Sequence, residues 1–281
     1  MSASARPLGR YLGEMVVVVG SILIAFGVDA WWDGRQAAQQ EQVILAELER
    51  DFQASLEGLD SLWLPTHRAA LNAGLELLWI VRTGSAAGYP AASGDNPWSA
   101  GSEAFLLPLA DVPFPGGPRT VQVRDSLVAV ALFEATYDPT LASLDALAQG
   151  EGLGVLRSYE LRGALAALSS VLADARDEEL RTRALVNEEL RPALRRAGNV
   201  ILPEIVAWRF FAPALPDGEP VPDRLRDHVL ELRVDGELAN ILASRLRLQM
   251  DVVGSLEDVR EIMVEVLELI EGELEEMSRR M

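Results

Sequence analysis

The sequence contains no cysteine among its 281 residues. Disulfide bonds, thiolate catalysis, iron–sulfur clusters and zinc–thiolate sites are therefore excluded. It also contains no lysine, so all 25 of its basic residues are arginine. A Walker-type phosphate loop and a Schiff-base mechanism both need a lysine, and the sequence excludes them as well.

Positive charge is scarce overall. The chain carries 43 acidic residues against 25 basic ones, which gives a formal net charge of −18. Nucleic-acid binding needs a clustered basic face, so we expect no nucleic-acid partner. The same negative charge opposes adsorption of the chain to an anionic lipid surface.

Residues that usually carry catalysis or bind metals are also few. The only histidines are His67 and His228, and neither has a second ligand of a useful type three or four residues further on. Gly150, Gly152 and Gly154 do not follow a strand and do not match a dinucleotide-binding motif. We therefore expect no metal, no other cofactor and no enzymatic activity.

The most informative feature that is present is an apolar stretch at residues 11–32, YLGEMVVVVGSILIAFGVDAWW. A helix of this length rises about 33 Å, which is enough to cross a hydrocarbon core of about 30 Å. Tyr11 at one end and Trp31 and Trp32 at the other suit the two membrane interfaces. The stretch predicts a single transmembrane helix.

Charge predicts the orientation of this helix. Arg6 and Arg10 precede it without any acidic residue, whereas acidic residues outnumber basic ones directly after it. The positive-inside rule then places residues 1–10 in the cytoplasm and residues 33–281 in the periplasm. The expected location is the bacterial inner (cytoplasmic) membrane, with the lipid bilayer as one partner.

A cleaved signal peptide is the alternative interpretation of the same stretch, because Val28 and Ala30 fit a small-residue cleavage pattern. Glu14 interrupts the beginning of the apolar run, which favours an uncleaved signal anchor. An acidic residue at membrane depth is a functional candidate. Arg10 lies four residues earlier on the same helix face, so a structural Arg10–Glu14 pair is the simpler explanation.

Small residues form a stripe within the predicted membrane helix. Gly13, Gly20 and Gly27 recur every seven residues, and Ser21 and Ala25 add small side chains nearby. Small residues let a second helix approach closely in lipid. The stripe predicts packing against other integral membrane proteins, in a hetero-complex or a homo-oligomer, although glycine is also common in membrane helices for no such reason.

Outside this stretch the apolar periodicity is helical, and we expect an all-α bundle in the periplasm. The transmembrane helix should continue through residues 33–64 and break at Pro65. Asp138 and Pro139 should cap and begin a helix. Two short segments, 120–124 and 228–234, are either strands or the beginnings of helices. The remaining expected helices are residues 66–82, a region from Val121, 158–196, 236–253 and 256–280.

The same periodicity predicts which side chains face the core. The expected inward residues are Val43, Leu45, Leu48, Phe52, Leu56, Leu59 and Leu62, then Leu161, Leu165, Leu168, Leu172 and Leu180, then Leu256, Val259, Met263, Val266 and Ile270.

Two loops rich in proline and glycine interrupt the helices, at about residues 83–118 and 212–222. A connection as long as the first is unusual in a compact domain. Its aromatic residues suggest that the loop docks on its own bundle or on a partner. These candidate contact residues are Tyr89, Trp98, Phe105 and Phe114.

The N-terminal region resembles the anchor of the DUF6090-like family, a group of uncharacterised bacterial single-pass membrane proteins. The resemblance rests on Gly13-Glu14, the Val16–Val19 run, Leu23-Ile24-Ala25 and Trp31-Trp32, with Asp29 where the family often has asparagine. Weaker similarity extends over the middle of the chain, including Tyr137-Asp138-Pro139, and over the terminal region from Leu232 through Leu274. The resemblance implies an anchored helical domain outside the cytoplasm, and it brings no assigned activity.

The sequence therefore favours a non-enzymatic accessory or scaffold subunit of a larger bacterial membrane complex. Respiratory assemblies and photosynthetic reaction-centre–antenna assemblies are the candidate complexes. The alternative is a periplasmic ligand-binding or sensing module. Because the predicted cytoplasmic part has only about ten residues, such a module would have to act through a partner membrane protein.

Overall fold

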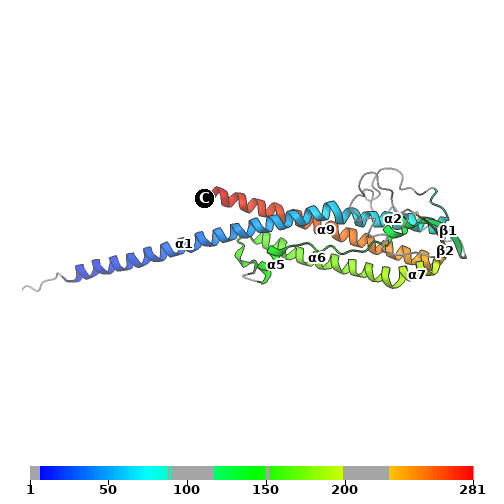
Figure 1. Cartoon of the computed structure of the whole chain (residues 1–281). Coiled ribbons are helices and arrows are strands. Elements are labelled where there is room, and N and C mark those ends of the chain that lie inside the picture. The colour runs from blue at the N-terminus through cyan, green and yellow to red at the C-terminus, as the bar shows by residue number, and fades with distance from the viewer. Residues whose placement is uncertain (1–6, 88, 90–116, 150–151, 199–227, 281) are drawn as a thin grey trace, which may run out of the picture. The chain divides into compact units, whose positions relative to one another are not determined.

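The computed structural model describes residues 7–87, 89, 117–149, 152–198 and 228–280, without the side chains of residues 7–14, 16–18 and 280. The described part is mostly helical (Figure 1), which confirms the expected helical class. Within it, no helix contains a segment that is both long and apolar enough to span a membrane.

The chain divides into two compact units, each assembled from distant segments. The first unit comprises Met1–Gln53, Thr140–Gly163 and Val266–Met281. The second comprises Ala54–Pro139 and Ala164–Glu265.

The N-terminal helix is longer than the predicted membrane segment. Helix α1 runs from Pro7 to Gly58, and a π-helical turn, η1 (Leu59–Trp63), leads directly into α2 (Leu64–Thr83). The expected continuation of the first helix into residues 33–64 is confirmed. The break expected at Pro65 is wrong, because the residues on both sides of the π turn keep right-handed helical dihedral angles.

A second π turn also lies just before a proline. Helix α6 (Tyr159–Leu185) passes through η5 (Val186–Leu190) into α7 (Arg191–Ala197), which confirms the expected long helix. Each π turn ends two residues before a proline, Pro65 or Pro192. Proline lacks an N–H, and its ring clashes with the carbonyl four residues earlier. The wider π turn accommodates that ring and lets the helix continue.

The C-terminal helix also continues where the sequence suggested an interruption. Helix α9 runs from Gly236 to Arg280 as one element, so the expectation of two helices is wrong. Gly254 lies in its interior and costs about 1 kcal/mol relative to alanine. The neighbouring Val252, Val253 and Leu256 are buried, and their packing offsets that cost.

In the first unit, two carboxylates of α1 hold the segment around helix α5 (Ala142–Gln149) and the 3₁₀ turn η4 (Leu153–Val155). The Oε1 atom of Glu41 accepts a hydrogen bond from the backbone N–H of Arg157 at 2.6 Å. The Oδ2 atom of Asp51 accepts bonds from the backbone N–H and the hydroxyl of Ser143, at 2.9 and 2.7 Å. These bonds lower the pKa of Asp51.

The second unit contains the only strands in the described part of the chain. Strand β1 (Arg119–Arg124) pairs antiparallel with β2 (Val229–Val234), with Val121 opposite Leu232. Both strands alternate buried and exposed residues, the pattern of a sheet with one face on the core. Of the two alternatives for residues 120–124 and 228–234, the strands are correct, so the expectation of helix from Val121 is wrong.

Helix α4 (Asp125–Ala131) follows β1, and no helix begins at Asp138 or Pro139 as expected. Residues 133–141 have no regular secondary structure. We call residues 133–139, which belong to the second unit, the linking segment.

The core of the second unit lies between α2, α4, α7, α9 and one face of the β1–β2 sheet. Helices α2 and α9 approach closely at Gly74, where an added Cβ atom would lie 2.7 Å from Cδ2 of Leu246. Glycine at this position therefore sets the spacing of the two helices.

Most of the predicted inward residues are buried, and three are not. Val43, Leu62 and Leu180 are 59%, 48% and 45% exposed, so their assignment to the core is wrong. Leu56 and Leu172 are half-buried. The confirmed core residues are Leu45, Leu48, Phe52, Leu59, Leu161, Leu165, Leu168, Leu256, Val259, Met263, Val266 and Ile270.

Candidate functional site

The apolar stretch of α1 is the first candidate site. Between Met15 and Gln40, none of the described side chains is buried. The large apolar side chains of this stretch are 46% to 70% exposed, and Trp31 and Trp32 are 60% and 61% exposed. The guanidinium of Arg35 lies 5.9 Å from the ring centroid of Trp31, a cation–π contact. A helix that exposes apolar side chains on every face has no cover among the residues that the structure describes.

The predicted packing stripe is open where it can be described. No heavy atom lies within 4 Å of a Cβ atom built at Gly20 or Gly27, and Ser21 is exposed. The side chains of the predicted Arg10–Glu14 pair and of Tyr11, and the surroundings of Gly13, lie outside the described residues.

The predicted aromatic loop is described only at its beginning. The ring of Tyr89 lies 6.3 Å from that of Trp79, and its hydroxyl donates to the carbonyl oxygen of Asn72 at 3.3 Å. Tyr89 therefore docks on α2 of its own bundle. Trp98, Phe105 and Phe114 lie outside the described residues, as does the second loop at 212–222.

The two histidines have different surroundings. His228 directly precedes β2, and its backbone N–H donates to Asp125 at 3.1 Å. His67 of α2 is 2% exposed. Among the described residues, no three histidine or carboxylate side chains are placed to hold a metal ion.

His67 belongs to a buried polar cluster that the sequence analysis did not identify. Its members come from three helices and lie beside the linking segment. The cluster comprises His67 of α2, Glu179 and Thr182 of α6, and Arg245 and Gln249 of α9, all between 1% and 4% exposed.

The cluster binds backbone groups of the linking segment. Glu179 accepts a hydrogen bond from the backbone N–H of Tyr137 at 2.8 Å, and Arg245 donates to the carbonyl oxygen of Phe133 at 2.8 Å. The hydroxyl of Tyr137 donates to the carbonyl oxygen of Ser55 in α1 at 3.1 Å. An irregular segment inside a helical bundle has peptide groups without ladder partners, and these side chains supply the partners.

Side chains also bind one another within the cluster. Arg245 donates to Oε1 of Gln249. The Nε2 atom of Gln249 lies 2.9 Å from Nδ1 of His67 and 3.3 Å from the carbonyl oxygen of the same residue. On its other side, Nε2 of His67 lies 3.8 Å from Oε1 of Glu179. The ring of Phe133 contacts the imidazole edge-on, with centroids 5.5 Å apart.

Burial changes the pKa of each ionisable group in the cluster. It raises the pKa of Glu179 to about 7 and lowers that of His67 to about 4, because both charged forms lose water. It lowers the pKa of Arg245 to about 10, so the guanidinium stays charged at neutral pH. The five side chains of the cluster are buried, which suits them to holding the linking segment in place.

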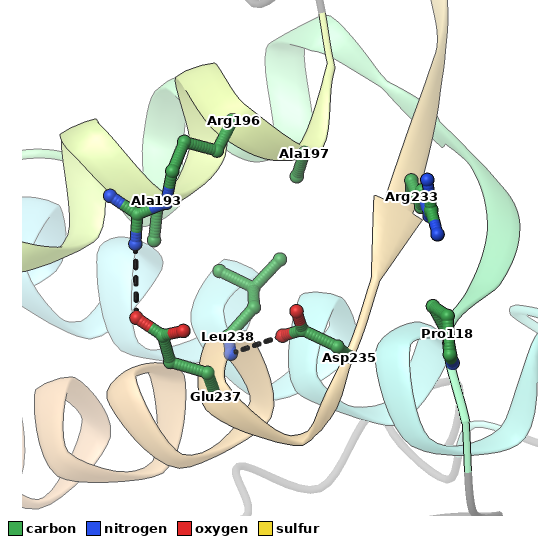
Figure 2. Close-up of a pocket in the computed structure, with 8 residues that line it drawn as sticks. All are labelled: Pro118, Ala193, Arg196, Ala197, Arg233, Asp235, Glu237 and Leu238. Carbon is green, nitrogen blue, oxygen red and sulfur yellow. Dashed lines mark hydrogen bonds and ion pairs between the residues drawn. The ribbon is translucent and has the colours of Figure 1, made fainter.

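A separate pocket of about 340 Å³ lies where α7, β2 and the beginning of α9 meet. Figure 2 shows Arg196 paired with Glu237 on one side and Arg233 projecting from β2 on the other. Asp235 caps α9 by accepting a hydrogen bond from the N–H of Leu238 at 3.0 Å. The pocket thus presents both signs of charge to a small ligand.

No protein-family model, curated protein or solved structure matches this chain.

Replacing Arg245 with methionine tests whether the buried cluster stabilises the fold. The change keeps an unbranched side chain but leaves the Phe133 carbonyl and the Gln249 amide oxygen without their donor. We expect a loss of about 3 kcal/mol in the free energy of unfolding. The measurement is denaturant unfolding of the full chain in mild detergent. The matched control is Arg247→Met, an exposed position on the same helix, and equal losses from the two changes would contradict the assignment.

Proposed function

We propose that the protein is a non-enzymatic, membrane-anchored accessory subunit of a larger bacterial membrane complex. Residues 11–32 form the anchor, and the helical units formed by the rest of the chain lie in the periplasm. The observation that carries the proposal is the run of exposed apolar side chains on α1, from Met15 to Trp32. Covering these side chains with lipid or with other membrane helices removes their contact with water.

Two further features support this role. The resemblance to the DUF6090-like anchor covers the same residues and implies the same topology. The open surroundings of Gly20 and Gly27 leave room for a neighbouring helix. Respiratory and photosynthetic reaction-centre–antenna assemblies are the candidate complexes, and the neighbour would be another integral membrane protein.

A second candidate function is a periplasmic ligand-binding or sensing module that acts through a partner membrane protein. The mixed-charge pocket between α7, β2 and α9 favours it, because about 340 Å³ can hold a small molecule. The arginines and carboxylates that line the pocket suit a ligand that carries both charges.

Membrane insertion can be tested with acidic substitutions on one helix. Leu23→Asp combined with Ile24→Asp puts two charges at the middle of the proposed span, each costing about 3 kcal/mol there. We expect the unaltered chain to resist extraction of membranes with alkaline carbonate and the double variant to be released. Val43→Asp, at an exposed position of α1 outside the span, should stay in the membrane. Release of the unaltered chain would contradict the anchor.

The packing stripe can be tested by adding volume at one glycine. Gly20→Leu should prevent close approach of a neighbouring helix and reduce the size of the particle isolated in mild detergent. Val19→Leu is the control, since it enlarges the adjacent side chain by one methylene. Mass spectrometry of the co-purifying proteins identifies the complex. A monomer without a stoichiometric partner in both the unaltered chain and the variants would contradict the accessory role.

The ligand-binding alternative predicts a rise in melting temperature with a small envelope metabolite that carries both charges. Binding to the folded state at 100 times the dissociation constant stabilises it by about 2.7 kcal/mol. Arg233→Ala should abolish the shift, while Arg247→Ala, outside the pocket, should preserve it. A shift that survives Arg233→Ala would locate the ligand elsewhere.

A further inference from the structure

The hydrogen bonds of the buried cluster fix which atom of His67 carries a proton. Arginine only donates hydrogen bonds, so the Gln249 atom that faces Arg245 must be its carbonyl oxygen. The amide nitrogen of Gln249 then points at His67, where it faces both Nδ1 and the carbonyl oxygen. Nδ1 therefore accepts a hydrogen bond, and the proton of the neutral imidazole is on Nε2.

This arrangement opposes a second proton on His67. The only lone pair available to a proton is that of Nδ1, which already accepts the Gln249 bond. Protonation of Nδ1 would place its N–H directly against the amide N–H of Gln249. The amide group of Gln249 cannot rotate through half a turn to avoid this, because its oxygen would lose the hydrogen bond from Arg245. The positive charge of Arg245 opposes an imidazolium in addition.

The surroundings of Glu179, in contrast, favour its protonated form. Its Oε1 atom accepts from Tyr137 and faces Nε2 of His67, but its Oε2 atom is buried without a hydrogen-bond partner among the described residues. A carboxylate buried with so few donors is disfavoured, whereas a carboxylic acid is tolerated. Arg176 and Arg183 on its own helix favour the charged form, and Asp138 of the linking segment disfavours it.

We propose that His67 and Glu179 form a proton-compensated pair that makes the packing of the linking segment insensitive to pH. In the closed cluster Glu179 carries the proton and both side chains are neutral. When the linking segment opens and both side chains meet water, the O–H bond of Glu179 breaks and an N–H bond forms at Nδ1 of His67. Carboxylate and imidazolium replace acid and imidazole, and the number of bound protons does not change.

The two pKa shifts have opposite effects on stability. Glu179 has a raised pKa in the folded chain, so its stabilising contribution is complete below its ordinary pKa of 4.5 and is lost as pH rises to about 7. His67 has a lowered pKa, so its destabilising contribution disappears as pH rises from about 4 to its ordinary value of 6.5. Between pH 4.5 and 6.5 the two changes offset each other.

Hydrogen exchange of the linking segment in the full chain tests the pair, with amide rates divided by the intrinsic rate at each pH. In the unaltered chain, protection of residues 133–139 should change by less than about threefold between pH 4.5 and 6.5. Glu179→Gln leaves only the histidine, and protection should rise about tenfold per pH unit. His67→Asn keeps an acceptor for Gln249 and leaves only the carboxyl group, so protection should fall about tenfold per unit.

Two controls separate this device from general effects. Glu178→Gln removes the adjacent carboxylate, which pairs with Arg181 at the surface, and should keep the flat profile of the unaltered chain. Peptides from the buried part of α9, residues 252–263, report global unfolding and should remain more protected than residues 133–139. Slopes of the same sign in the two single variants would overturn the proposal.

A measurement on the unaltered chain keeps the proposal testable even if a variant does not fold. The chain has two histidines, so its imidazole ¹⁵N spectrum contains two sets of signals. One set of signals should be that of a neutral ring protonated at Nε2, and it should remain so down to pH 5. The same set should be missing from the spectrum of the His67→Asn variant, which assigns it to His67. Two histidines that both protonate by pH 6 would overturn the proposal. The pair lies within the second unit, so its failure would leave the proposed membrane anchor unaffected.

Discussion

The packing of the second unit depends on one constraint: a stretch of irregular backbone lies among its helices. The N–H of Phe133 donates to the carbonyl oxygen of Val130 at 3.0 Å, but irregular backbone cannot pair all of its peptide groups in this way. Leaving the others unpaired would cost several kcal/mol. Glu179 and Arg245 supply an acceptor and a donor for two of these groups. Gln249 accepts a hydrogen bond from Arg245, and its amide nitrogen faces His67, whose Nε2 atom lies 3.8 Å from Glu179. The buried cluster thus follows from the path of the chain.

The same constraint explains where the helices tolerate irregularity. Both π turns precede a proline, and both lie near residues that hold the linking segment. Trp63, the last residue of η1, packs edge-on against Tyr137, with ring centroids 6.2 Å apart. Asn187 in η5 and Arg191 directly after it bind the carboxylate of Glu134, at 2.9 and 2.8 Å. A π turn changes the direction of the side chains that follow it. This change helps those side chains to reach the linking segment, which is not helical.

Periodicity predicted the helical class and most of the core because each long helix carries an apolar stripe. The sequence did not predict that the helices continue through Pro65 and Gly254, because proline and glycine are normally taken as signals that a helix ends. In the structure a π turn accommodates the proline, and packing offsets the cost of the glycine. The exposed Val43, Leu62 and Leu180 show the other limit. Periodicity identifies a stripe, but the width of the stripe depends on which neighbours pack against it.

The buried cluster was missed because its residues resemble surface residues when each is considered alone. The sequence did contain a signal. Arg245 and Gln249 interrupt the apolar stripe of α9 between Leu242 and Leu256, at positions where helical spacing requires core residues. A polar residue within a core stripe indicates a buried partner, and two of them four residues apart indicate a polar layer. The partner itself could not be predicted, because the linking segment is distant in sequence and has no periodicity.

The exposed apolar stretch of α1 and the buried cluster make complementary demands on their surroundings. Within the described part of the chain, nothing covers the apolar side chains of the first, and the proposed cover is lipid or another membrane protein. The second binds two peptide groups of the linking segment, and in the proposed pair one proton moves from Glu179 to His67 when that segment opens. In the proposed periplasmic location, the domain would experience the pH of the surrounding medium. In a chain with 43 acidic residues, surface carboxylates already make stability depend on pH. A core whose own titrations cancel between pH 4.5 and 6.5 adds nothing to that dependence in this range, which would suit the proposed accessory subunit.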